Sequence, residues 1–212
     1  NQSLQRRAAT SYLAALEFAK VTIAHQEEVL SSLARSAKDK SDICVRYASA
    51  KPEQVPMMFL NLVKGEYAYL DVPMRYIFDA QPKILRTQPQ AYYVLAGQKL
   101  VKEQLDRQQI AYTVLGQKEH IKGEAYKILK INYQGDAKDP AKRKIGPAAQ
   151  MSVDVSTEER KIELPEGSLC ISLDQPKARL ICLLMEPDAY LSYVARGLIA
   201  VAPGDELPIY RK

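Results

Sequence analysis

Closely spaced strand-like segments fill residues 121–185, and this pattern constrains the fold more than any other feature of the chain. The segments are rich in branched and apolar side chains and cover residues 121–133, 151–155, 161–164, 169–173 and 179–185. Residues with turn chemistry separate them at 135–147, 156–160, 165–168 and 174–177. Strands at this spacing are typical of an antiparallel sheet or sandwich. We therefore predict a β-rich domain over residues 119–212.

The N-terminal stretch has a helical pattern. Residues 4–38 contain neither Pro nor Gly. Apolar side chains recur there at steps of three, four or seven, at Tyr12, Leu16, Ala19, Ile23, Leu30 and Leu33. This spacing predicts one amphipathic helix of roughly 30 residues. The average helix of a globular protein has about 11–12 residues. We expect it to brace two lobes or to pack along a neighbouring domain.

The middle of the chain mixes both patterns. Strands are predicted around Ile43, Val45 and Tyr47, at 66–78 (as one strand or two, interrupted by Pro73), at 91–95 and at 110–115, with a helix at 98–108. The chain is therefore predicted to be α+β. Its expected domains are a helix at 1–40, a mixed strand and helix region at 41–118, and the β-rich domain at 119–212.

Composition excludes some classes of function. The chain has 212 residues, of which 47% are hydrophobic and 26% charged, so it can form a real core. It lacks an apolar run near the roughly 18 residues that span a bilayer, and we expect no membrane span. The net charge of +5 is spread along the chain. Its densest cluster (Lys138, Lys142, Arg143 and Lys144) lacks interleaved aromatic residues, so we expect a solvated loop and no nucleic-acid partner.

Two histidines permit one metal hypothesis. His25 and Glu28 form a His-x-x-Glu pair, and His120 could supply a third zinc ligand for a small hydrolase. The pair falls within a predicted helix among other polar residues, a combination common on solvated faces. The absence of Gly-x-Gly and Gly-Lys-Ser/Thr motifs gives no support for nucleotide binding.

The cysteines are Cys44, Cys170 and Cys182, and their apolar contexts indicate buried thiols. A disulfide between Cys170 and Cys182 is one alternative, provided that their two predicted strands pair. A cysteine nucleophile with His120 as its base also stays open, although buried thiols are usually inert.

Tyrosine is over-represented, with 13 residues against 3 Phe. Tyr67, Tyr69, Tyr92 and Tyr93 suit ordinary strand packing, or alternatively a groove for a peptide or glycan. The candidate acid–base carboxylates Asp174, Glu186 and Asp188 lie beside or near prolines, where acidic residues commonly form turns.

The C-terminal part of the chain carries a series of short motifs. They are a Pro-x-Gly-Ser turn (Pro165, Gly167, Ser168), an Asp-Gln-Pro corner (174–176), a strand ending in Leu-Leu-Met-Glu-Pro (183–187), and Ser192 with Gly197. In order and spacing they resemble the region that follows the catalytic domain in certain zinc carboxypeptidases. Arg196 stands where that family usually has Trp. Residues 88–95 and 109–112 are similar to an upstream block of the family, so the resemblance extends roughly from Arg6 to Tyr210.

The resemblance implies a non-catalytic accessory region that packs on a peptidase domain of the same polypeptide. The zinc, its ligands and the peptide substrate would belong to that domain, so no catalytic, cofactor or metal residue is expected in this chain. Because the sequence starts at Asn1 without Met, we expect a piece of a longer protein, exported from the cytoplasm if it follows the family. The alternatives are a free-standing peptide- or glycan-binding β module, and a zinc hydrolase built on His25, Glu28 and His120.

Overall fold

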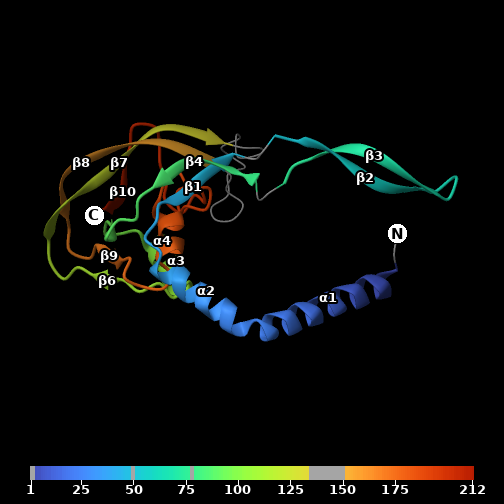
Figure 1. Cartoon of the computed structure of the whole chain (residues 1–212). Helices are drawn as coiled ribbons and strands as arrows, with labels where there is room; N and C mark the ends of the chain where they lie inside the picture. The colour runs from blue at the N-terminus through green and yellow to red at the C-terminus, as the bar shows by residue number, and fades with distance from the viewer. Residues whose placement is uncertain (1–2, 49–50, 77–78, 134–150) are drawn as a thin grey trace. The chain divides into compact units, whose positions relative to one another are not determined.

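The computed structural model describes residues 3–48, 51–76, 79–133 and 151–212 (Figure 1). The predicted turn at 135–147 and its basic cluster lie outside the described residues. The chain separates into two compact units, Asn1–Lys40 and Ser41–Lys212. None of the described helices combines the length and apolar character needed to cross a membrane. The domain boundary expected after residue 118 stays a prediction.

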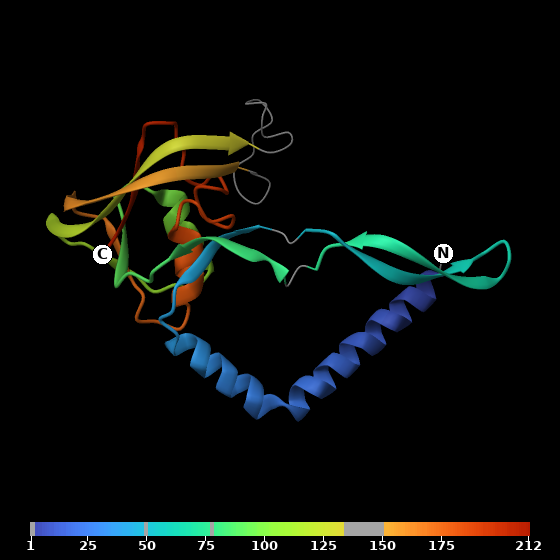
Figure 2. The same cartoon turned by 45° about the horizontal axis from the view of Figure 1, so that its top comes forward.

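The first unit consists of α1 (Leu4–Ala24) and α2 (Gln26–Lys38). The Ser3 side chain accepts a hydrogen bond from the Arg6 N–H at 3.3 Å and caps α1. The predicted long N-terminal helix is confirmed, since α1 has 21 residues. It is not one uninterrupted helix of roughly 30 residues, because His25 adopts φ −109° and ψ 23° and separates α1 from α2 (Figure 2). Just before it, the Thr22 hydroxyl donates to the Phe18 carbonyl at 2.8 Å, a back-bond of the kind that bends helices.

The second unit is built on a six-stranded antiparallel sheet. Its strands are β5 (Ala91–Val94), β6 (Thr113–Val114), β7 (Glu119–Tyr133), β8 (Met151–Leu164), β9 (Leu169–Ser172) and β10 (Glu206–Arg211). Their order across the sheet is β6-β9-β5-β10-β7-β8. The α+β prediction with a β-rich C-terminal part is confirmed, and strands from both sides of residue 118 share this sheet.

Helices α3 (Lys99–Arg107) and α4 (Ala178–Met185) pack on one face of this sheet. Alternation along β5 sets the two faces, because Tyr92 and Val94 join the core beneath the helices while Ala91 and Tyr93 join a smaller cluster on the other side. Tyr126 and Ile128 of β7 lie in the same core as α3 and α4. Most of the buried apolar residues described therefore belong to the core that α3 and α4 share with the sheet.

Two further strand pairs complete the unit. β1 (Ile43–Ala48) pairs with β4 (Gln81–Arg86), and both Ile43 and Val45 enter the main core. β2 (Glu53–Asn61) pairs with β3 (Glu66–Met74) in a separate hairpin. The Asn61 side chain accepts from the Val63 and Lys64 N–H groups, and Gly65 has φ +68° at the turn. The sequence reasoning missed β2, β4 and β10.

Two strand predictions near the C-terminus need correction. Residues 179–185 form helix α4, not a strand. Residues 156–160 are not a turn, because β8 continues through them opposite β7, with Ser156 paired to Lys127 and Arg160 to Gly123. As a consequence, Cys170 lies in β9 and Cys182 in α4, and both thiols are free. The condition for a Cys170–Cys182 disulfide, two paired strands, is not met.

Candidate functional site

The most concentrated polar chemistry in the second unit surrounds Glu186, which follows the last turn of α4. Its side chain is fully buried. The Tyr92 hydroxyl donates to its Oε1 at 2.5 Å, and the Tyr126 hydroxyl donates to its Oε2 at 2.7 Å. Because β5 and β7 supply these tyrosines, one carboxylate ties α4 to two strands of the sheet.

Two arginines balance the charge of Glu186. Arg211 Nη1 lies 3.4 Å from its Oε1, and Arg86 Nε lies 3.7 Å from its Oε2. Arg86 Nη2 also donates to Asp188 Oδ2 at 2.6 Å. We call these six residues (Glu186, Asp188, Arg86, Arg211, Tyr92 and Tyr126) the Glu186 cluster.

Burial dominates the electrostatics of the Glu186 cluster. Loss of solvent raises the pKa of Glu186, against the opposing effects of the tyrosine hydrogen bonds and the two arginines. Burial and the neighbouring carboxylate raise the pKa values of Tyr92 and Tyr126 well above their ordinary range. The tyrosines therefore stay protonated and donate to Glu186. Glu186, Tyr92 and Tyr126 have no exposed surface, and their hydrogen bonds join the end of α4 to β5 and β7.

A third arginine extends the network to β1. Arg46 Nε donates to the Asp188 carbonyl at 3.1 Å, its Nη1 to Asp154 Oδ1 at 3.0 Å, and its Nη2 to the Val153 carbonyl at 2.7 Å. Sequence reasoning considered Glu186 and Asp188 as candidate acid–base carboxylates or as turn residues, not as members of a buried ion-pair network. The two arginines that pair with them lie about 100 and 25 positions away, at Arg86 and Arg211, and no local signal links them.

The motif residues behind the family resemblance also have structural roles. Ser168 Oγ donates to the Pro165 carbonyl at 2.7 Å, and Gly167 has φ +82° in that turn. The Gln175 side-chain amide accepts a hydrogen bond from the Ala111 N–H and donates one to the Ala111 carbonyl, each at 3.0 Å. Ser192 Oγ accepts from the Ala195 N–H and donates to the Pro187 carbonyl. These hydrogen bonds fix turns and corners, as expected for Asp174 to Pro176.

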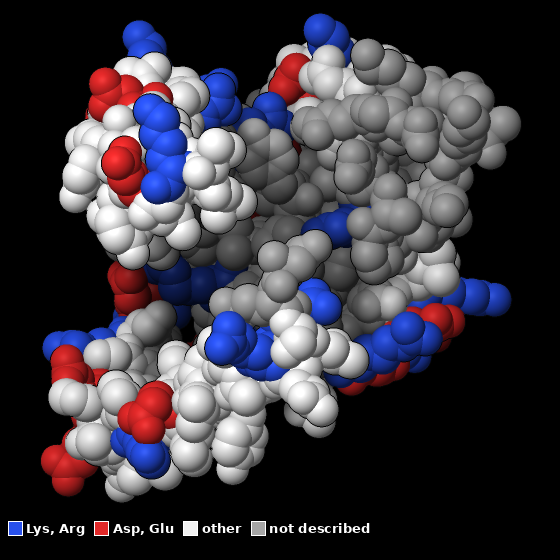
Figure 3. All heavy atoms as spheres, turned by 90° about the vertical axis from the view of Figure 1, so that its right-hand side faces the viewer, with Lys and Arg blue, Asp and Glu red and all other residues white. Residues whose placement is uncertain are grey.

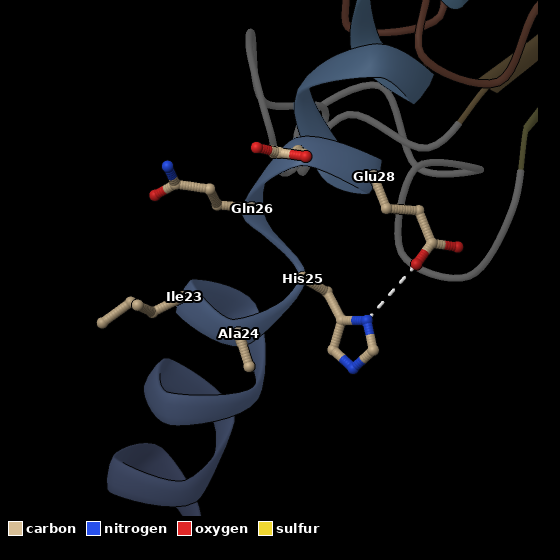
Figure 4. A pocket seen from close by; sticks show the side chains of 6 residues that line it. Ile23, Ala24, His25, Gln26 and Glu28 are labelled. Carbon is tan, nitrogen blue, oxygen red and sulfur yellow. Dashed lines mark ion pairs between the residues drawn. The ribbon is translucent and has the colours of Figure 1, made fainter.

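The histidines of the metal hypothesis lie in exposed ion pairs. His25 Nδ1 lies 3.3 Å from Glu28 Oε2 beside the helix break, where Ile23 to Glu28 line a shallow open hollow (Figure 4). His120 Nε2 lies 3.5 Å from Glu163 Oε2 on the β7–β8 hairpin. Within the described residues, no group of three His, Cys, Asp or Glu side chains is placed to hold a metal. The zinc hypothesis for His25, Glu28 and His120 stays a prediction.

The burial of individual side chains tests the predicted tyrosine groove and the predicted buried cysteines. Tyr92 and Tyr93 are buried. The prediction of a binding groove lined jointly by Tyr67, Tyr69, Tyr92 and Tyr93 is therefore wrong. Cys44 is exposed, in contrast to the expected buried thiol, whereas Cys182 is buried and its pKa is raised to about 11 by loss of solvent. A protonated, buried thiol is a poor nucleophile.

The β2–β3 hairpin is apolar on both of its faces. On one face, Met58 and Leu60 pair with Tyr69 and Tyr67, and on the other Met57 pairs with Leu70. All six side chains are exposed, and Tyr69 and Tyr67 are 71% and 70% exposed. In the first unit, α1 likewise exposes Leu13, Phe18, Val21 and Ile23. On the face shown in Figure 3, Lys and Arg intermingle with Asp and Glu and leave wide areas uncharged.

Comparison with known proteins gives one consistent similarity. The proteins named Carboxypeptidase 2 from Trichophyton rubrum, Trichophyton equinum and Trichophyton tonsurans are each 22% identical to the chain over 222 residues. Each alignment covers 100% of this chain but only 38% of the relative's length. No protein-family model and no solved structure matches the chain. The chain is therefore weakly similar to a region of these carboxypeptidases.

Proposed function

We propose that the chain is a non-catalytic C-terminal accessory region of a carboxypeptidase-like protein. It packs on the peptidase domain of the same polypeptide and supports that domain's cleft or its stability. The observation that carries this proposal is the alignment of the entire chain with 38% of each Carboxypeptidase 2 sequence. The zinc and the residues that cleave peptides would lie in the remaining part of such a protein.

The exposed apolar hairpin supports the docking role. A two-stranded hairpin is only marginally stable alone in water, and large exposed apolar patches mark interaction sites. Both faces of β2–β3 carry such side chains, including Met58 at 57% and Phe59 at 41% exposure. A neighbouring peptidase domain that covers this hairpin would remove those side chains from water.

The experiment is to express the complete gene product, with and without residues 1–212, and to assay release of C-terminal residues from peptides. We expect chelator-sensitive release by the complete protein and none by the 212-residue chain alone. The truncated protein is expected to lose thermal stability or activity. A second variant replaces only the exposed Leu62 and Val63 at the hairpin turn with Ser. It leaves the six-stranded sheet intact and should weaken only the docking of the hairpin.

The proposal fails if the complete gene product lacks a peptidase segment, or if removing residues 1–212 changes neither its melting temperature nor its activity. Carboxypeptidase activity in the 212-residue chain alone would overturn the non-catalytic assignment. That result would return attention to His25, Glu28 and His120 as metal ligands.

A further inference from the structure

A cavity of about 420 Å³ lies between the C-terminal half of α3 and the segment that follows α4. Its apolar walls come from Leu184, Leu191, Leu198 and the ring of Tyr193. Leu184 and Tyr193 belong to the main core, and Leu198 packs against that core. The walls are therefore set by the packing of the second unit, and the volume falls within the range of about 300–1,000 Å³ typical of small-molecule sites.

The polar part of the cavity contains donors. Tyr193 donates to Gln108 Oε1 at 2.9 Å, which fixes this amide with its NH₂ group still available as a donor. Gln104 lies on α3 three positions before Arg107 and four positions before Gln108, so it neighbours both on the helix surface. Gln108 and Gln104 are half-buried, whereas Arg107 is exposed at the cavity mouth.

The charge of the cavity selects anions. Its lining includes the exposed cation Arg107 and, among the described residues, no Asp or Glu. Asp106, which is adjacent to Arg107 in the sequence, accepts a hydrogen bond from the Tyr112 hydroxyl at 2.7 Å. Arginine binds carboxylates through two parallel N–H groups, which adds geometric specificity to the charge attraction.

We infer that this cavity binds a small amphipathic carboxylate, with the carboxylate at Arg107 and a branched or linear hydrocarbon group against Leu184, Leu191 and Leu198. Such a group is present both in a free aliphatic acid and in a peptide that ends in an apolar residue. The inference does not depend on the accessory role, because every residue involved lies within the second unit.

The test is to titrate the 212-residue chain with N-acetyl-L-leucine, octanoate and a short peptide ending in leucine. Binding is monitored by two-dimensional NMR. We expect shifts centred on Gln108, Leu191 and Leu198, with a Kd of roughly 1 mM or tighter for the best probe. Preference for octanoate identifies a free acid as the ligand source, and preference for the peptide identifies a C-terminus. N-acetyl-leucinamide, which lacks the carboxylate, should bind at least about tenfold more weakly.

Matched variants separate a built site from general charge attraction. Arg107→Gln should weaken binding of the acids about tenfold. Lys102 lies on the same helix but lines a different cavity, so Lys102→Gln should leave their binding unchanged. Leu191→Asn, at a 47% exposed position, should weaken all apolar probes without unfolding the chain. Equal binding of acid and amide, binding of inorganic phosphate alone, or no shifts up to about 10 mM would each overturn the inference.

Discussion

The six-stranded sheet and the β2–β3 hairpin use similar apolar residues in opposite environments. In the sheet, Tyr126 and Ile128 are buried beneath α3 and α4. In the hairpin, Tyr69 is 71% and Phe59 41% exposed, and the two strands pair only with each other in the described sheets. The comparison teaches that an apolar strand pattern predicts a strand but not the layer that covers it. In this chain, the covering layer distinguishes structural residues from those available for contact.

The largest expected effect comes from breaking the Glu186 cluster. Glu186→Ala removes the acceptor of two tyrosines and leaves Arg211 and Arg86 without their shared buried carboxylate. We expect a loss of about 3–5 kcal/mol in the free energy of unfolding, measured by urea denaturation. Glu186→Gln is the size-matched control. It should lower the free energy of unfolding by less, because the amide oxygen still accepts a hydrogen bond from one tyrosine hydroxyl. A change below about 1 kcal/mol for the alanine variant would show that this cluster does not tie α4 to the sheet.

A second change tests the close packing of the sheet without altering charge. A Cβ at Gly123 would lie 2.5 Å from the backbone oxygen of Arg211, where β7 approaches β10. We expect Gly123→Ala to lower stability by about 1–3 kcal/mol through forced movement of the backbone. Gly65→Ala at the hairpin turn meets no atom within 4 Å, so its cost is limited to strain from φ +68°. The comparison fails if the hairpin variant loses more stability than Gly123→Ala.

The third prediction concerns alkaline pH. The pKa values of Tyr92 and Tyr126 are raised well above 10.0, so above pH 10 the unfolded chain releases these protons while the folded chain retains them. Stability should therefore fall as pH rises above 10, by up to about 1.4 kcal/mol per pH unit for each tyrosine. Tyr126→Phe should make this slope shallower in pH-dependent urea titrations. Tyr69→Phe in the exposed hairpin is the matched control, and an equal change of slope in both variants would contradict the assignment.

The smallest expected effect lies in the hairpin. Met58→Ser or Tyr69→Ser removes an exposed apolar side chain and should change the stability of the isolated chain by less than about 0.5 kcal/mol. The same substitutions should reduce binding of a hydrophobic dye. A large loss of stability would mean that the hairpin is already packed in the isolated chain, which would remove the contrast with the sheet.

The sequence predicted the elements with a clear period. Alternation identified β1, strand-forming residues identified β5 and most of β7, and the apolar stripe of Val101 and Leu105 identified α3. Residues 179–185 were misassigned because a short run that is apolar on all sides fits a buried strand and a buried helix equally well. Polar residues 156–160 concealed the continuation of β8, an outer strand of the six-stranded sheet whose charged side chains remain exposed.

Local sequence patterns specify the α+β class, the β-rich C-terminal part and the motif turns, because these depend on local period and on residues such as Gly167 and Pro165. Tertiary structure alone decided that Glu186 collects two tyrosines and two arginines from distant elements, and that one set of apolar strands is covered while the hairpin is exposed. The physical reason is that desolvation and ion pairing depend on distances through space, which local sequence patterns do not specify.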